Sequence, residues 1–286
     1  MTTQESRNHH FVPQFLLRPW CNKGLLHGYW WDTRQDKLAC KKNGPKSFCW
    51  HRDLLRLRTR NVQRDAIETN IFQDIDTRGA KARNRLMESG PSGLSEDERC
   101  DFVRLLLSLE ARRPVNVRKI REGRQFLVDS IDNNPGMRAI MAAEGLVETP
   151  SEYYERETGI FLEDDALTII QSLVDNPKVG GKLINAHWLI IQLGRFDGSL
   201  VLSDRPLIKI KGADHPQFVW ALPLSPKAAF IACNHRDELR KIRRLTPQRF
   251  AKKINDDSAG QAERFIFCAD ENLNDWIGKR LHPRST

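Results

Sequence analysis

The chain has 286 residues, of which 40% are hydrophobic and 29% charged, and its net charge is +9. This length can bury a full core, and the composition is that of an ordinary globular protein. No apolar run is long enough to span a membrane, and no basic segment leads into an apolar one as in a signal peptide, so a cytoplasmic protein without a membrane partner is expected. The positive charge predicts attraction to polyanions, with nucleic acid as the expected partner.

The six cysteines are scattered and form no disulfide framework, so reduced thiols are expected. Zn²⁺ binds sulfur and nitrogen donors, and such donors gather near the start of the chain, at Cys21, His27, Cys40, Cys49 and His51. Their spacings match no zinc knuckle, which disfavours zinc. The chain also lacks the glycine-rich and nucleophile motifs of common nucleotide-binding proteins and α/β-hydrolases.

The first predicted element is residues 8–20, which places two histidines, a glutamine and an arginine among large apolar side chains. Chain termini are usually exposed, but so many apolar groups favour burial, and we expect this segment to dock into the core. Residues 25–31 and 37–41 follow as a predicted β-hairpin, because aromatic residues such as Trp30 and Trp31 favour strands.

The middle of the chain is predicted to be helical. Apolar residues recur at steps near four over residues 61–88, which indicates one amphipathic helix. Ser95 and Glu98 form a capping box that starts the next helix, and Pro114 separates that helix from a basic one over residues 115–131. Shorter helices are expected at residues 137–144, 151–156 and 163–175.

After residue 180 the apolar period becomes strand-like. Strands over residues 188–193 and 200–202 are predicted to form a hairpin, because Asp197-Gly198 between them is a strong turn pair. The further strands of an antiparallel sheet are expected at residues 207–211, 218–222 and 228–233. The last predicted elements are a helix from Thr246 to about residue 254, a strand over residues 265–268 and a helix over residues 272–281.

This order of elements predicts an α+β fold with an N-terminal motif and hairpin, a helical middle, and a C-terminal antiparallel sheet with helices. We expect a single domain over residues 1–286, with subregions 1–60, 61–180 and 181–286.

The opening stretch reads His9-His10-Phe11-Val12-Pro13-Gln14-Phe15-Leu16-Leu17-Arg18. It resembles the start of the bacterial family known as domain of unknown function 4238. Residues 68–85, 105–114 and 200–207 resemble later parts of that family. Two positions depart from its usual pattern: Pro19 separates Arg18 from the aromatic Trp20, and Asp76 stands in place of a glutamate. The resemblance implies an outline of the chain and a set of polar motifs, but no activity.

His9 and His10 are the first candidate catalytic residues. Adjacent residues of an extended segment point in opposite directions, so at most one histidine can face a given site. His10 is a candidate general base, with His9 and Gln14 as further catalytic candidates. In the structural alternative, both histidines are hydrogen-bonded to hold the N-terminus and Gln14 serves backbone groups. A His-Asn-His nuclease is disfavoured, because Asn43 precedes a Gly-Pro pair and would not lie on a helix.

Glu68, Asp76 and Asp204 are candidate ligands of a divalent cation, Mg²⁺ or Mn²⁺. Glu68 and Asp76 are eight residues apart, which on a helix rotates them by about 80° and lets both flank one groove. Asp204 ends a predicted strand, where functional side chains often face a cleft, and is also a catalytic candidate. In the structural alternative, Asp204 caps the turn that follows it and the two helix acids pair with arginines.

Arg112 and Arg113 end an apolar helix stripe, so at least one guanidinium should be partly buried beside a carboxylate or a bound phosphate. Both are candidates for binding substrate, together with Arg18 and Ser203.

The leading hypothesis places His10, Asp204, Glu68 and Arg113 in one polar cleft, as the site of a metal-assisted nuclease or phosphodiesterase that acts on nucleic acid. The competing hypothesis is a non-catalytic nucleic-acid- or protein-binding module whose polar motifs only hold the fold. A role in bacterial defence is compatible with either hypothesis.

Overall fold

The N-terminal motif is held by a short pair of strands. The computed structural model describes residues 7–58, 63–269 and 273–282, and its first strand pairs antiparallel with the strand that follows the hairpin. Trp20 is buried, and its indole N–H donates to the Leu200 carbonyl at 2.9 Å, so the motif docks into the core as predicted. The elements here are β1 (Asn8–His10), α1 (Gln14–Leu17), two 3₁₀-helices (Arg18–Trp20 and Pro45–Ser47) and β4 (Trp50–Arg52).

The predicted hairpin is present as β2 (Leu26–Asp32) and β3 (Lys37–Asn43). It belongs to a sheet in the order β3-β2-β10-β6, in which β6 (Leu202–Ser203) and β10 (Ile266–Phe267) come from the C-terminal part of the chain. The hairpin predicted around Asp197-Gly198 is therefore wrong, because β6 joins a different sheet from the strand before it. A turn signal is local and does not show which sheet the next strand enters.

Most of the predicted helices form, but the first begins at Ile67 and not at residue 61, and residues 61 and 62 lie outside the described residues. The sequence did not predict the last helix of this region, Pro177–Asn185. The capping box is present: the Glu98 backbone N–H donates to Ser95 Oγ at 3.2 Å, and the Ser95 backbone N–H donates to the Glu98 carboxylate at 2.9 Å. A π-helix (Ile67–Phe72) leads into this region. The α-helices are α2 (Gln73–Ser89), α3 (Glu96–Ala111), α4 (Pro114–Asp132), α5 (Pro135–Ala143), α6 (Pro150–Thr158), α7 (Asp165–Val174) and α8 (Pro177–Asn185), with short 3₁₀-helices at Pro91–Gly93 and Leu162–Asp164.

A second antiparallel sheet has the order β5-β9-β8-β7. Its strands are β5 (His187–Gln192), β7 (Ile208–Ile210), β8 (Val219–Ser225) and β9 (Ala228–Cys233). Along β9, Phe230 packs in one hydrophobic core and Ile231 in another, so both faces of the sheet are covered. Phe102 of α3 packs edge-on against Phe230 on the first face, with ring centres 4.9 Å apart.

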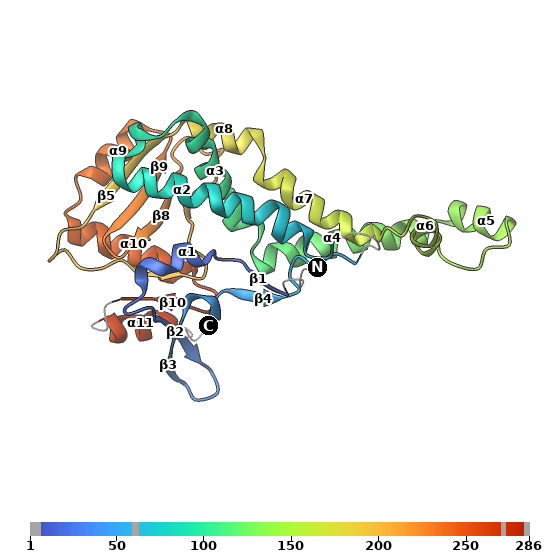
Figure 1. Ribbon diagram of the computed structural model, residues 1–286, viewed down its shortest axis with the longest axis horizontal. Coiled ribbons are helices and arrows are strands. Elements are labelled where there is room, and N and C mark those ends of the chain that lie inside the picture. The colour runs from blue at the N-terminus through green and yellow to red at the C-terminus, as the bar shows by residue number, and fades with distance from the viewer. Residues whose placement is uncertain (1–6, 59–62, 270–272, 283–286) are drawn as a thin grey trace, which may run out of the picture.

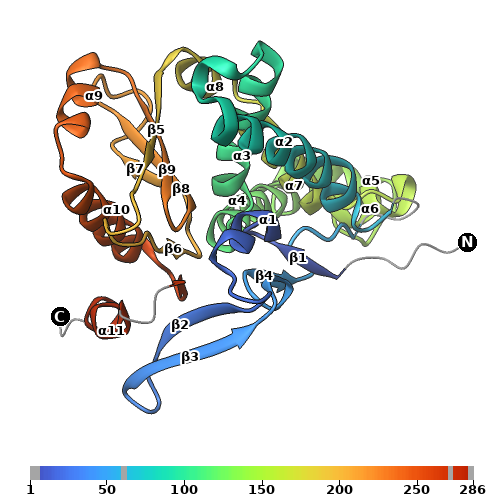
Figure 2. The ribbon, with the colours of Figure 1, turned by 60° about the vertical axis from the view of Figure 1, so that its left-hand side comes forward.

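The second face of this sheet is covered by α9 (Arg236–Arg243) and α10 (Pro247–Gln261), and α11 (Asn274–Leu281) closes the described chain. Figure 2 shows α9 and α10 on one side of the sheet and α2 and α3 on the other. The sequence did not predict α9, and α10 continues beyond the predicted end near residue 254.

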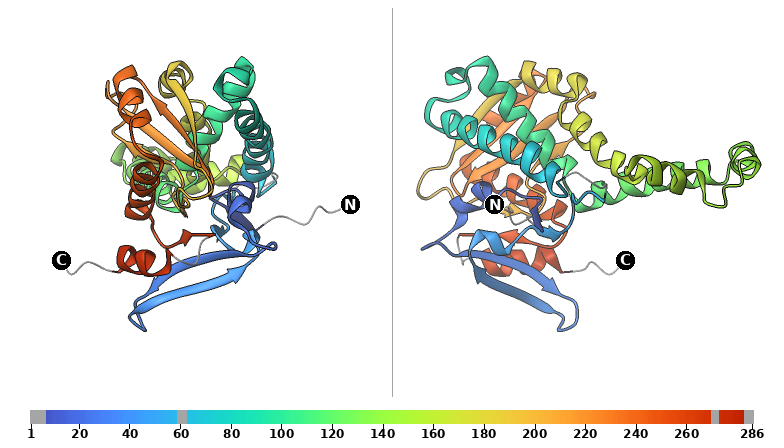
Figure 3. Two further views of the ribbon diagram at one scale, coloured as in Figure 1. Left: turned by 90° about the vertical axis from the view of Figure 1, so that its left-hand side faces the viewer. Right: turned by 45° about the vertical axis from the view of Figure 1, so that its right-hand side comes forward.

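Helices α4, α5 and α6 extend away from the rest of the molecule, with α5 at the far end (Figures 1 and 3). None of the helices in the described part of the chain combines the length and the apolarity that crossing a bilayer would require.

Candidate functional site

The two histidines of the N-terminal motif have different surroundings. Strand β1 directs their side chains to opposite sides, and His9 is fully buried whereas His10 is partly exposed. The Leu55 backbone N–H donates to His9 Nδ1 at 2.8 Å, which ties β1 to the chain that follows β4. Solvent therefore reaches His10 and not His9, so His10 is the member of the pair that is placed for chemistry.

His10 lies beside Glu68 of the π-helix. The His10 backbone N–H donates to the Glu68 carboxylate, and His10 Nε2 lies 3.3 Å from the Lys46 carbonyl oxygen. Burial lowers the pKa of the His10 imidazole, and the positive charge of Arg112 lowers it further. His10 is therefore mostly neutral at pH 7.

Glu68 is an unusual carboxyl group. Burial raises its pKa to about 7; the charge of Arg112 opposes this rise, while the negative charge of Asp76 adds to it. Its Oε2 atom is buried and has no hydrogen-bond partner among the described residues. The π-helix that carries Glu68 is a rare conformation that recurs at functional sites. A carboxyl group near half protonation at neutral pH can either donate or accept a proton.

Arg112 is the buried cation of this site. Its terminal nitrogens donate to the two oxygens of Asp76 at 3.0 and 2.5 Å, and one of them also donates to Ser108 Oγ at 3.0 Å. The guanidinium lies 4.8 Å from the centre of the Phe72 ring. Arg112 has no exposed surface, so it does not present its guanidinium to a substrate as the sequence suggested. It fixes Asp76 instead and places positive charge near Glu68 and His10.

We call His10, Glu68, Asp76 and Arg112 the N-terminal polar cluster.

Asp204 and Arg113, which were expected in the same cleft as His10 and Glu68, interact with another segment. The Asp204 carboxylate accepts hydrogen bonds from three successive backbone N–H groups, those of Glu263, Arg264 and Phe265, at 2.9, 2.8 and 3.1 Å. Burial nevertheless raises the pKa of Asp204 to about 6.

Arg113 contacts the same segment as Asp204, whereas Ser203 contacts its own turn. Arg113 forms ion pairs with Glu263 and Glu110 and is only 9% exposed, which leaves little of it for a substrate. Ser203 is buried, and its hydroxyl donates to the Arg205 carbonyl at 2.8 Å. Asp204 therefore has structural contacts, but it binds a distant segment and does not cap the turn that follows it, as the structural alternative had expected.

Gln14 and Arg18 are the two remaining predicted site residues, and both belong to the N-terminal motif. Gln14 is half-buried as the first residue of α1, and Arg18 is exposed at the start of a 3₁₀-helix. Their predicted roles in catalysis and substrate binding stay predictions.

The predicted cation ligands do not form one set. Among residues 7–58, 63–269 and 273–282, no three histidine, cysteine, aspartate or glutamate side chains are placed to hold a metal ion. Asp76 is bound by Arg112 and Asp204 by backbone N–H groups, and of the three predicted carboxylates Glu68 keeps an oxygen without a partner. This arrangement does not fit Mg²⁺ or Mn²⁺, which bind several oxygens at once. None of the six cysteines, all of which lie within the described residues, is joined in a disulfide.

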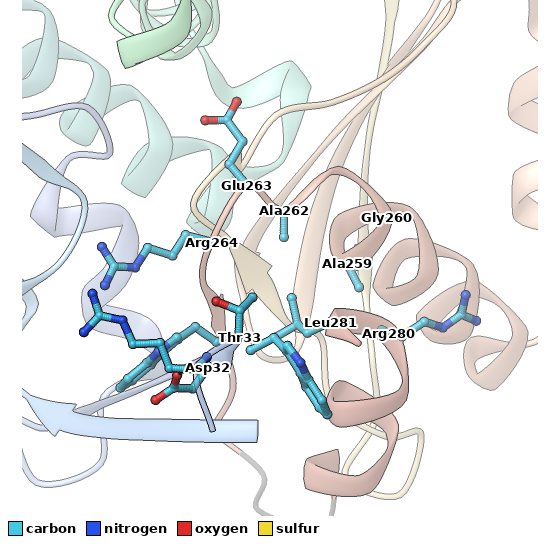
Figure 4. Close-up of a pocket in the computed structure, with 12 residues that line it drawn as sticks. Asp32, Thr33, Ala259, Gly260, Ala262, Glu263, Arg264, Arg280 and Leu281 are labelled. Atoms are coloured by element: carbon cyan, nitrogen blue, oxygen red, sulfur yellow. Dashed lines mark hydrogen bonds between the residues drawn. The ribbon is translucent and has the colours of Figure 1, made fainter. Parts of the chain in front are cut away.

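A cavity of about 920 Å³ lies between the turn of the β2–β3 hairpin, the end of α10 and the end of α11. We call it the arginine-tryptophan groove after its lining residues Trp30, Trp31, Arg34, Arg264 and Arg280. Figure 4 shows Glu263 and Arg264 leaving one segment in different directions, with Arg280 on the opposite side of the groove. That segment is the one that Asp204 binds, so Asp204 secures a wall of the groove.

Sequence reasoning missed the groove, and it missed Glu110. The Glu110 carboxylate accepts from Lys209 Nζ at 2.5 Å and lies 3.4 Å from Arg113. No local pattern marks Glu110, because Lys209 is distant in the chain. The groove had a sequence signal, since the adjacent Trp30 and Trp31 precede the basic Arg34.

Comparison with known proteins identifies a family but no function. A family model described as "Protein of unknown function (DUF4238)" matches residues 8–272. No curated protein and no solved structure matches the chain.

Proposed function

The chain belongs to this family of unknown function, and we propose that it hydrolyses phosphodiester bonds of nucleic acid, with His10 and Glu68 as its proton-transfer groups. The observation that carries the proposal is Glu68: a partly buried carboxyl group with a pKa of about 7 and an unpartnered oxygen, hydrogen-bonded to the backbone of a neutral histidine. Neighbouring titratable groups whose pKa values are shifted from their ordinary values are typical of acid–base sites.

The two groups have complementary protonation states. A carbonyl oxygen only accepts hydrogen bonds, so His10 Nε2 carries the proton toward Lys46, and Nδ1 keeps the lone pair that a general base needs. His10 Nδ1 takes the proton of the attacking water. Protonated Glu68 gives its proton to the leaving oxygen of the cleaved ester. The Asp76–Arg112 pair positions these groups and helps to set the pKa of Glu68.

Nucleic acid is the proposed substrate because the chain carries a net charge of +9 and exposes arginines beside tryptophans in the arginine-tryptophan groove. A divalent cation would supply charge stabilisation at the phosphate oxygens, but Asp76 and Asp204, two of its three predicted ligands, have other partners, so the proposed steps use only His10 and Glu68.

The test is cleavage of single-stranded RNA, single-stranded DNA and duplex DNA by the purified chain, both with Mn²⁺ and with a chelator. We expect Glu68→Gln and His10→Gln each to lower the cleavage rate about a hundredfold or more, because each removes one proton transfer. Glu88→Gln is the matched control, since Glu88 is an exposed glutamate on α2. Full activity of Glu68→Gln, or no cleavage by the unmodified chain under either condition, contradicts the proposal.

The second candidate function is binding of single-stranded nucleic acid without cleavage, and the arginine-tryptophan groove favours it. Arg34 and Arg264 are exposed, and the Arg264 guanidinium stacks 4.8 Å from the Phe265 ring centre. Aromatic and guanidinium groups together bind bases and phosphates of single strands. Stable binding of an oligonucleotide that remains intact, with no loss of affinity on Glu68→Gln, distinguishes this function from hydrolysis.

A further inference from the structure

The helical arm, residues 114–160, buries few of its side chains. It contains α4, α5 and α6 and projects from the body of the molecule (Figure 1; Figure 3, right). On α4 both Val117 and Val128 are buried, but none of the residues of α5 is buried. An isolated helix shorter than about 12 residues is marginal in water, and the nine residues of α5 contact α4 and α6 without burying a side chain.

The arm exposes large apolar side chains on each of its helices. Phe126 is 71% exposed and Leu127 50% on α4, and Ile140 is 65% exposed on α5. Val147 is fully exposed in the loop before α6, and Tyr154 on α6 is 39% exposed. Single exposed apolar residues are ordinary, but a concentration of them on one projecting element marks an interaction surface.

The charge of the arm changes along its length. Residues 114–124, next to the body, contain four basic residues and one acidic residue. Residues 125–160, the outer part, contain seven acidic and two basic residues, a net charge of −5 in a chain whose total is +9. The outer part therefore repels nucleic acid and anionic membranes, and it is complementary to the basic residues of its own protein.

We propose that two copies of this chain associate through their helical arms in antiparallel orientation. A two-fold axis across the arms places the acidic outer part of each copy against the basic first half of α4 in the other, where Arg118 and Lys119 are exposed. The same contact covers Phe126 and Ile140. An antiparallel pair satisfies both the charge pattern and the apolar exposure with one self-complementary surface. This inference is independent of the proposed hydrolysis.

The first test is the molar mass of the full-length chain in solution, by light scattering and sedimentation equilibrium. We expect a dimer, and we expect Phe126→Asp with Ile140→Asp to raise its dissociation constant about a hundredfold, since two interface anchors are lost. Phe196→Asp is the matched control, because Phe196 is 90% exposed but lies outside the arm, between β5 and β6. All three substituted side chains are exposed, so the melting temperature of the monomer should stay unchanged.

The second test uses charge reversal to identify the partner as an antiparallel copy. Lys119→Glu and Glu144→Lys each place like charges across the two-fold axis, and each should weaken self-association about tenfold. Mixing the two variants should restore association as a heterodimer, because both charge contacts then become favourable. A monomeric unmodified chain, a dimer unaffected by the arm substitutions, or no recovery on mixing overturns the proposal.

Discussion

The backbone N–H of His10 donates a hydrogen bond to the carboxylate of Glu68, which joins the N-terminal motif to the first turn of the helical region. This contact places a histidine with a lowered pKa next to a glutamate with a raised one.

The cleavage rate should have a bell-shaped pH dependence. His10 must be neutral to act as a base, so activity should rise through its pKa, which lies below the ordinary value of 6.5. Glu68 must be protonated to act as an acid, so activity should fall through a pKa of about 7. The measurement is kcat/KM across pH. An optimum well above pH 7 contradicts these roles.

Glu68 should make the stability of the fold depend on pH. Its pKa is raised from 4.5 to about 7 in the folded state, so its favourable contribution is complete below pH 4.5 and is lost as pH rises through 7. Between pH 4 and pH 8 the free energy of unfolding of the unmodified chain should fall by about 3 kcal/mol relative to Glu68→Gln. Urea unfolding of both proteins across this range measures the difference, and a constant difference rejects the assigned pKa.

Substitution of His9 should mainly lower stability, whereas substitution of His10 should mainly lower activity. His9→Ala should destabilise the fold by about 2 kcal/mol or more, because it empties a buried site and leaves the Leu55 N–H without its acceptor. His10→Ala should cost less than about 1 kcal/mol, since His10 is partly exposed, but it should abolish cleavage. The melting temperature and the cleavage rate of both variants provide the test. A stable but inactive His9→Ala together with an unstable but active His10→Ala would contradict the prediction.

Asp204→Asn should behave as a structural variant. The carboxylate accepts from three backbone N–H groups, and an amide cannot replace both oxygens, so a loss of about 2 kcal/mol is expected. Amide hydrogen exchange should quicken at residues 263–265. Asp197→Asn is the control, because Asp197 accepts a backbone N–H in a surface turn and should cost much less. If Asp204→Asn kept its stability but lost its activity, Asp204 would instead be a catalytic residue.

Asp76→Asn should strongly lower the free energy of unfolding. It removes the negative partner of the fully buried Arg112, and an uncompensated buried charge costs about 3 to 5 kcal/mol. Asp74→Asn, two residues away, breaks an exposed pair with Arg78 and should cost less than about 0.5 kcal/mol. Denaturant unfolding of the two variants compares these costs directly, and equal costs would mean that Arg112 is stabilised without Asp76.

Much of the fold was accessible from local sequence. The capping box at Ser95 and Glu98, the aromatic first strand of the hairpin and the basic helix that starts at Pro114 all form where predicted. These features depend on side chains and backbone groups within a few residues of one another, so their physical causes are visible in a short window.

The functional assignments also divide into those that depend on local sequence and those that depend on contacts between distant residues. The sequence by itself determined that at most one histidine of the pair could face a given site, because strand geometry sends neighbours to opposite sides. It also marked Glu68, Asp76, Arg112 and Asp204 as candidate site residues. Only the tertiary structure decided that Asp76 binds Arg112, that Asp204 secures the segment beside the groove, and that Glu68 is left with an unpartnered oxygen. Burial and hydrogen-bond partners come from contacts between distant parts of the chain, and they set the pKa values on which the proposed chemistry depends.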